Sequence, residues 1–201
     1  MRKLILKILS IFLPIALLFI FLYLMPYFLT LRYYSSNYLA ANIDKQRILK
    51  NTPSPKIVFI GGSNLAFGLN SEEVEKKLGR PVVNMGLHAS LSLSFMLNEI
   101  KTSIKQGDII IIVPEYEHFQ NNFYKKGSDD TIACLLYVNP AASKYLQPAI
   151  RYRAILKNIF ILEKLRTGDL VDFLVKDQER KRTHHDEITY RGGFNGKGDM
   201  V

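Results

Sequence analysis

Lys56–Phe67 reads KIVFIGGSNLAF, and this stretch decides the fold that the sequence predicts. Its first half, Ile57–Ile60, is an unbroken run of β-branched and aromatic residues between prolines and glycines, which is typical of a strand buried on both faces of a parallel sheet. The glycines tolerate a sharp turn, which brings Ser63 and Asn64 to the carboxyl end of the strand. Because sites in open α/β sheets form outside those ends, Ser63 is the first candidate for chemistry.

Two more strands are expected farther along the chain, at Pro81–Met85 and Ile109–Val113. The first follows a short helix with Ser71 as its N-cap and Gly79 as its stop, and the second follows a helix at Leu91–Lys105. Four apolar residues of this second helix have the spacing to face the sheet: Leu93, Leu97, Ile100 and Ile104. Strand, helix, strand, helix and strand in succession predict an α/β fold with a parallel sheet and right-handed crossovers.

The pattern changes after the third strand. Gln120–Asp130 is loop-like, Ala141–Leu174 reads mainly as helix, and Arg191–Gly198 is loop-like with four glycines. No further strand is evident in the sequence, which would leave both outer strands with open edges. We therefore expect the chain to be incomplete at its C-terminus, with more strands and an Asp-x-x-His motif in the residues that follow.

Two short blocks resemble those of a known superfamily. Gly61-Gly62-Ser63-Asn64 after a hydrophobic strand resembles the first block of the SGNH (GDSL-like) hydrolases, with Gly62 where the family usually has Asp. Val82–Gly86 resembles the second block, a strand ending in a glycine. The resemblance covers about Lys56 to Phe119, and it looks most like the membrane-anchored branch that handles acyl groups on cell-envelope polysaccharides. It implies a flavodoxin-like parallel sheet with flanking helices.

The resemblance also implies roles for individual residues. A serine ester hydrolase needs a nucleophile, a base and donors for the oxyanion. Ser63 would be the nucleophile, and the backbone N–H of Gly86 would be an oxyanion donor beside that of Ser63. Asn84 and Asn64 would support substrate binding. As structural alternatives, Ser63 and Gly86 are turn residues without a catalytic role.

The third block departs from the family pattern, which offers Gly-x-Asn-Asp after the third strand. Here Pro114–Phe119 reads PEYEHF, so Tyr116 or His118 would have to replace the missing Asn as a donor. Glu115 and His118 form an E-x-x-H pair that suits an orienting carboxylate and a base, or alternatively two solvated loop residues. The family's late Asp-x-x-His is absent. His88 lacks an evident orienting partner, and His184 and His185 lie in a charged run.

Two functions from different classes are consistent with this pattern. The first is a serine esterase or O-acyltransferase that acts on acyl esters of envelope glycans or lipids. The second is a non-catalytic binding or assembly protein of the cell envelope that keeps the fold without the triad, as the departures in the third block suggest.

The N-terminal part reads as a membrane anchor. Residues 8–31 form an apolar stretch of about 24 residues, above the ~20 that a helix needs to cross a bilayer. Arg2, Lys3 and Lys7 place the N-terminus in the cytoplasm by the positive-inside rule. We therefore expect a cytoplasmic N-terminus (1–7), a transmembrane anchor (8–31), a juxtamembrane segment and linker (32–55) and an extracytoplasmic α/β domain (56–201). The alternative is a cleaved signal peptide.

The distribution of charge and the cysteine content indicate which partners and ligands to expect for this chain. The formal net charge of +9 gathers near the membrane-proximal segment and at Lys176–Arg182, without the aromatic interleaving of nucleic-acid binders. We expect the bilayer, an acyl-bearing glycan or lipid, and envelope assembly proteins as partners, and no nucleic acid. Cys134 is the only cysteine and no zinc pattern is present, so neither a disulfide, a metal nor a cofactor is expected.

The topology gives a first prediction. A reporter fused after Asn51 is expected to be active if it functions outside the cytoplasm and silent if it functions only inside. Activity of the cytoplasm-only reporter would contradict the predicted orientation.

Overall fold

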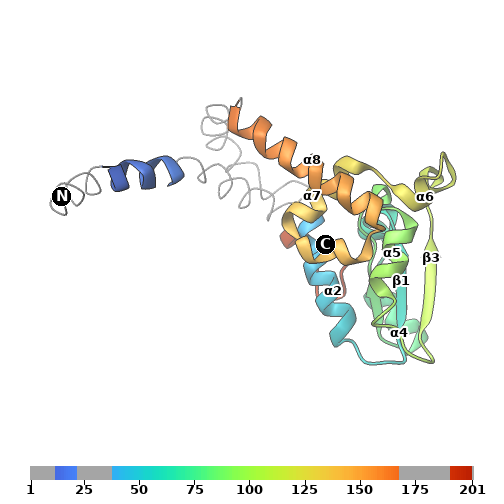
Figure 1. Cartoon of the computed structure of the whole chain (residues 1–201). Helices are drawn as coiled ribbons and strands as arrows, with labels where there is room; N and C mark the ends of the chain where they lie inside the picture. Colours follow the sequence, from blue (N-terminus) through green and yellow to red (C-terminus); the bar gives the residue numbers. More distant parts are fainter. Residues whose placement is uncertain (1–11, 22–37, 168–190, 201) are drawn as a thin grey trace.

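The computed structural model describes residues 12–21, 38–167 and 191–200 (Figure 1). Most of the expected anchor lies outside these residues, as do Lys176–Arg182, His184 and His185. Residues 12–21 are helical. In the part of the chain that is described, no helix has both the length and the apolar character needed to span a membrane.

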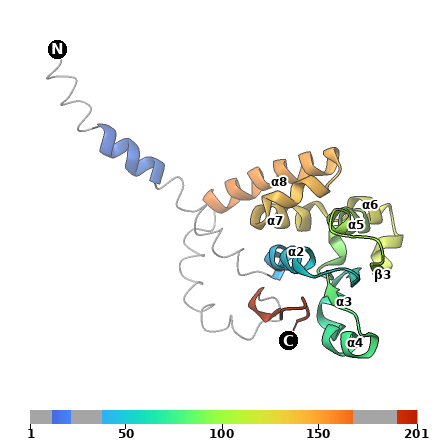
Figure 2. The same ribbon diagram turned by 90° about the horizontal axis from the view of Figure 1, so that it is seen from below.

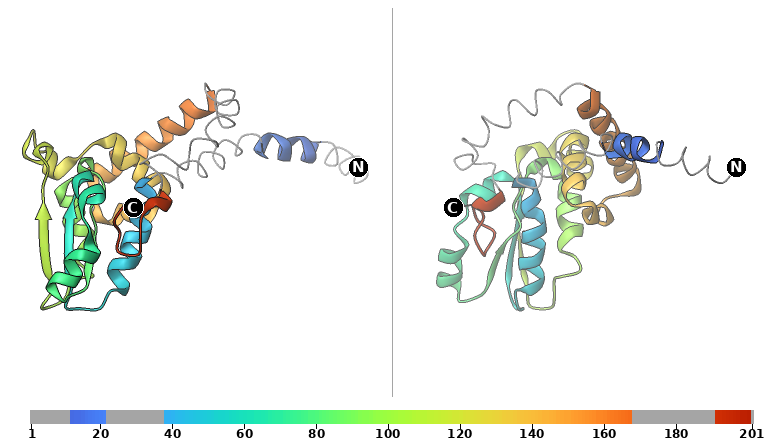
Figure 3. Two further views of the ribbon diagram at one scale, coloured as in Figure 1. Left: turned by 180° about the vertical axis from the view of Figure 1, so that it is seen from behind. Right: turned by 90° about the vertical axis from the view of Figure 1, so that its left-hand side faces the viewer.

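The described residues contain one sheet of three parallel strands in the order β2-β1-β3. Its strands are β1 (Ile57–Gly61), β2 (Val82–Asn84) and β3 (Ile109–Val113), which confirms the predicted α/β class and all three strand positions. The central strand β1 is buried along its whole length. By contrast, β3 forms an outer edge (Figure 3), where Ile109, Ile110 and Ile112 are 40–47% exposed.

The helices between the strands differ in detail from the prediction. After α3 (Ser63–Gly68), helix α4 runs over Ser71–Leu78 and ends at Gly79 as predicted, with φ 63° at that glycine. Its N-cap is Asn70, not Ser71, because the Asn70 side chain accepts from the N–H of Glu73 while the Ser71 hydroxyl donates to Asp199.

The second crossover contains a 3-10 turn η2 (Ala89–Leu91) and helix α5 (Leu93–Ile100), which is shorter than the predicted Leu91–Lys105. Ser92 caps α5 with its side chain, and a turn follows Ile100. Leu97 is 42% exposed and does not face the sheet as predicted; Phe95, Met96 and Ile100 are the apolar residues that α5 buries.

Helix α2 (Ala41–Asn51), with the 3-10 turn η1 (Tyr38–Ala40) before it, packs into the main core. Ala41 and Leu49 belong to the same apolar cluster as Val58 and Ile60 of β1. Within the stretch predicted as a juxtamembrane segment and linker (32–55), residues 41–51 thus form a helix of the main core. Figure 2 shows it between the α7–α8 pair and the C-terminal segment.

Between β3 and residue 167 the chain forms α-helices and 3-10 turns. They are η3 (Tyr116–Phe119), α6 (Phe123–Lys126), α7 (Asp129–Val138), η4 (Pro140–Tyr145) and α8 (Pro148–Thr167). The main core lies between the sheet, α2, α5 and α7, and a smaller cluster of Ile57, Phe59, Leu65 and Val82 covers the other face of the sheet. Cys134 packs against the main core, and burial raises the pKa of its thiol.

The segment after residue 190 forms a docked turn, although its glycines suggested an open loop. A short 3-10 turn η5 (Arg191–Gly193) leads into an antiparallel bridge between Phe194 and Met200. The N–H of Asn84 at the end of β2 donates to the carbonyl of Lys197 over 3.0 Å. Gly198, with φ 90°, allows this approach, because a Cβ there would lie 2.5 Å from the Asn84 carbonyl oxygen. We call residues 191–200 the C-terminal hairpin.

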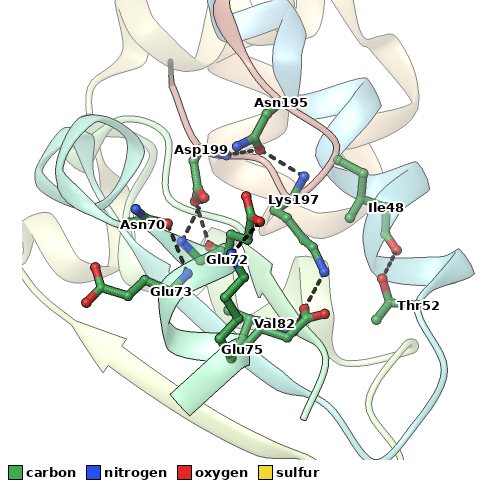
Figure 4. A network of polar contacts seen from close by, with 12 residues as sticks. Ile48, Thr52, Asn70, Glu72, Glu73, Glu75, Val82, Asn195, Lys197 and Asp199 are labelled. Atoms are coloured by element: carbon green, nitrogen blue, oxygen red, sulfur yellow. Dashed lines mark hydrogen bonds and ion pairs between the residues drawn. The ribbon is translucent and has the colours of Figure 1, made fainter. Parts of the chain in front are cut away.

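Polar contacts attach the C-terminal hairpin to α4 and β2 (Figure 4). The carboxylate of Asp199, 3% exposed, accepts from the N–H of Ser71 (2.8 Å), the Ser71 hydroxyl (2.6 Å) and the Asn84 amide (2.9 Å). Lys197 pairs with Glu75, whose carboxylate also accepts from the N–H of Val82. The hairpin is therefore held by charge-assisted hydrogen bonds, which are stronger than neutral ones.

Buried ionisable side chains of α2 and α5 lie close to these contacts of the C-terminal hairpin. Lys45 of α2 donates to the carbonyls of Asn84 and Gly198. Burial lowers the pKa of Lys45 to about 7, although the carboxylates of Asp199 and Glu99 favour its charged form and oppose this shift. Glu99 of α5 accepts from the side chains of Asn42 and Gln46. Burial raises the pKa of Glu99 to about 7.

Glu99 gives a prediction on stability and pH. Because the pKa of Glu99 is about 7 in the folded chain, above the 4.5 usual for a glutamate, the folded state binds more protons between these two pH values. Its contribution is thus complete at low pH and is lost as pH rises toward 7. The Glu99→Gln variant has no such loss. The free energy of unfolding of the variant minus that of the parent should therefore increase by about 1 kcal/mol or more between pH 4.5 and 7.5.

Urea unfolding at a series of pH values measures the difference. The control is Glu72→Gln, which changes an exposed carboxylate of α4. Its difference from the parent should stay nearly constant, and an equally flat result for Glu99→Gln would contradict the prediction.

Candidate active site

The turn after β1 holds the first group of candidate residues. Gly62 is the N-cap of α3, so Ser63 begins that helix half-buried and Asn64 follows it exposed. A Cβ at Gly61 would lie 2.5 Å from the carbonyl oxygen of Val113 in β3. One at Gly62 would overlap the Glu115 carboxylate. Both glycines are therefore demanded by the close approach of β3 and its following residues.

Glu115 brings a carboxylate to this turn from the end of β3. Its Oε1 lies 3.5 Å from the Ser63 hydroxyl oxygen and 3.4 Å from the backbone nitrogen of Asn64. Both contacts are long for hydrogen bonds, and catalytic contacts commonly shorten only when substrate is bound. The structure thus brings together Ser63, Asn64 and Glu115, three residues that the sequence singled out from two distant stretches.

His118 lies beneath Glu115 and is 1% exposed. Its Nδ1 accepts from the backbone N–H of Glu115 over 2.9 Å, so Nε2 carries the proton of the neutral ring and donates to the carbonyl of Ala89 over 2.9 Å. The E-x-x-H spacing forms a capping box on η3. Both ring nitrogens are engaged away from Ser63, so this geometry fits a residue that orients Glu115 better than a base for Ser63.

Asn84 and Gly86 lie at the end of β2, fully buried beneath α3. The Asn84 side chain donates to the Leu65 carbonyl (2.9 Å) and to Asp199, and it accepts from the N–H of Gly86 (2.9 Å). The N–H expected to bind an oxyanion thus already has a partner. A Cβ on Gly86 would overlap Leu65, so the packing of α3 is sufficient to explain this glycine.

Tyr38 and His88 complete the surroundings of Glu115. The Tyr38 ring lies 6.1 Å from the rings of both His88 and Phe67. Burial and the Glu115 carboxylate raise the pKa of Tyr38 to about 12. Burial lowers the pKa of His88, although the carboxylates of Glu115 and Glu117 oppose this shift. The Nδ1 of His88 accepts from the N–H of Ser90 over 3.1 Å.

Sequence reasoning missed Tyr38, because it precedes α2 in the stretch predicted as a juxtamembrane segment and linker. No local pattern there signals that this segment comes close to Glu115. Tyr116, by contrast, was expected as a donor, and it is 90% exposed on η3.

No metal centre is evident among the described residues, which contain no cluster of three or more His, Cys, Asp or Glu side chains placed to hold an ion. Comparison of the chain with protein-family models, curated proteins and solved structures gives no match. The functional argument therefore depends on the geometry around Ser63 and Glu115.

Gly62 gives a prediction for this site. Gly62→Ala places a methyl group on the Glu115 carboxylate and should lower the free energy of unfolding by about 1–3 kcal/mol. The matched control is Gly68→Ala at the other end of α3, where a Cβ would meet nothing within 4 Å. The control should be neutral or stabilising by up to about 1 kcal/mol. Equal stability of the two variants in chemical unfolding would show that Glu115 does not occupy this position.

Proposed function

We propose that this chain is an SGNH-like serine esterase or O-acyltransferase with a flavodoxin-like sheet. It is held by its N-terminal anchor on the outer side of the cytoplasmic membrane, and it acts on acyl esters of envelope glycans or lipids. The observation that carries the proposal is the Ser63 hydroxyl at the β1–α3 turn, with the Glu115 carboxylate 3.5 Å away, at the carboxyl end of a parallel sheet. The resemblance of the two glycine-containing blocks supports the same assignment.

The chemistry follows from these groups. The Ser63 oxygen attacks the ester carbonyl carbon while Glu115 accepts its proton. Glu115 then returns that proton to the departing alcohol, which leaves an acyl group on Ser63. Water completes hydrolysis, or an acceptor hydroxyl completes transfer, with Glu115 again taking the proton. The Asn64 N–H, now 3.4 Å from Glu115, is the nearest candidate donor to the oxyanion. His118 keeps Glu115 in place through its backbone N–H.

A second function has its own support. The Ser63–Glu115 contact is long, and both His118 nitrogens and the Gly86 N–H are engaged elsewhere. These features suit an envelope protein that uses the surface around Ser63 and Glu115 to bind a ligand or to assemble with other envelope proteins, without catalysis.

Labelling with a serine-directed fluorophosphonate tests the choice. The folded 201-residue chain is expected to be labelled, Ser63→Ala to lose the label, and Ser143→Ala on η4 to keep it. Glu115→Gln should slow labelling by about 10² or more, since proton removal from a nucleophile is worth about that much. Absence of labelling in the folded parent would contradict the enzyme and favour the binding protein.

A further inference from the structure

Exposed aromatic side chains lie on η3, next to Glu115 in sequence, and near the end of α3. Tyr116 is 90% exposed, Phe119 73% and Phe67 39%, although such residues are normally a main part of cores and interfaces. Half-buried Tyr38 lies 6.1 Å from the ring of Phe67 and 6.1 Å from that of His88, and both Tyr38 and His88 interact electrostatically with the Glu115 carboxylate. We call these five residues the aromatic rim. Apolar exposure that gathers at one place marks a binding surface.

The geometry of η3 explains how one turn carries both Glu115 and two exposed rings of the aromatic rim. In a 3-10 helix, residues three apart lie in one row. Glu115 at the N-cap and His118 form the inner row, with His118 fully buried. Tyr116 and Phe119, each one residue farther along, form the adjacent row, which faces solvent.

The polar groups among the rings indicate which ligand this surface suits. Glu115 is half-buried, and Glu117 and Asn64 are exposed. A lipid chain lying here would desolvate the carboxylates without offering them a hydrogen bond, which is costly. Carboxylates would also repel a phosphate-rich polymer. A sugar ring meets both needs, because its C–H face packs on an aromatic ring while its hydroxyls donate to carboxylates.

We propose that the aromatic rim binds neutral sugar rings of a glycan chain, and that this contact brings an acyl ester on the glycan to Ser63. The second half of this statement rests on the proposed esterase or acyltransferase function, whereas the binding half does not. Tyr116 and Phe119 provide the outer stacking surface, and Glu117 accepts hydrogen bonds from sugar hydroxyls.

The test uses the 201-residue Ser63→Ala chain, so that binding is measured without turnover. A panel of neutral oligosaccharides, plain and O-acetylated, is titrated by calorimetry and by saturation-transfer NMR. Tyr116→Ala combined with Phe119→Ala should weaken binding at least tenfold, while Tyr116→Phe should retain it because the ring remains. The matched control is Tyr152→Ala on α8, a 64% exposed tyrosine outside the rim. It should bind like the parent.

Each outcome separates the two proposals, because a small fluorophosphonate does not need the rim. Loss of oligosaccharide binding in the rim variant supports the inference, whether or not Ser63 is labelled. Labelled Ser63 with no oligosaccharide bound by the folded parent, or with a rim variant that binds like the parent, overturns the inference and leaves the enzyme. Binding to phospholipid vesicles that depends on the rim, with no oligosaccharide bound, overturns it as well.

Discussion

The buried side chain of Asn84 is the contact on which the position of Ser63 depends. It has no exposed surface, yet both its donors and its acceptor are used: it binds the Leu65 carbonyl of α3, the Asp199 carboxylate of the C-terminal hairpin and the N–H of Gly86. Leaving one of these groups unpaired would cost about 1–3 kcal/mol. Through this one amide, the end of β2 fixes the position of α3, and with it the position of Ser63.

The charges around Asn84 join parts of the chain that are far apart in sequence. Lys45 donates to the carbonyls of Asn84 and of Gly198, which is 153 residues away, and it lies 4.5 Å from the centre of the Phe194 ring. A buried ion costs several kcal/mol unless it is well paired. Lys45 therefore favours the docked C-terminal hairpin, because undocking the hairpin would take the Gly198 carbonyl and the Asp199 carboxylate away from a buried ammonium group.

The sequence predicts local features of this fold better than distant pairings. The β-branched runs located all three strands, and the glycine turn predicted Ser63 at the carboxyl end of β1, where the structure has it. The polar residues Asn42, Lys45 and Gln46 fall in the stretch predicted as a juxtamembrane segment and linker. Nothing local indicated their burial, because their partners Glu99 and Asp199 are more than fifty residues away and share no local pattern with them. For the same reason, E-x-x-H suggested a base and its orienter, whereas the ring of His118 pairs with the backbone of Glu115 and with Ala89 of the neighbouring turn.

Gly62 and Glu115 come from different stretches of the sequence and meet at one point in space. A side chain at position 62 would overlap the Glu115 carboxylate, which arrives from the end of β3. The same carboxylate is within reach of the Ser63 hydroxyl and the Asn64 N–H. The two positions are therefore coupled by sterics: a larger residue at 62 would exclude Glu115, and the loss of Glu115 would leave the turn without its acidic group.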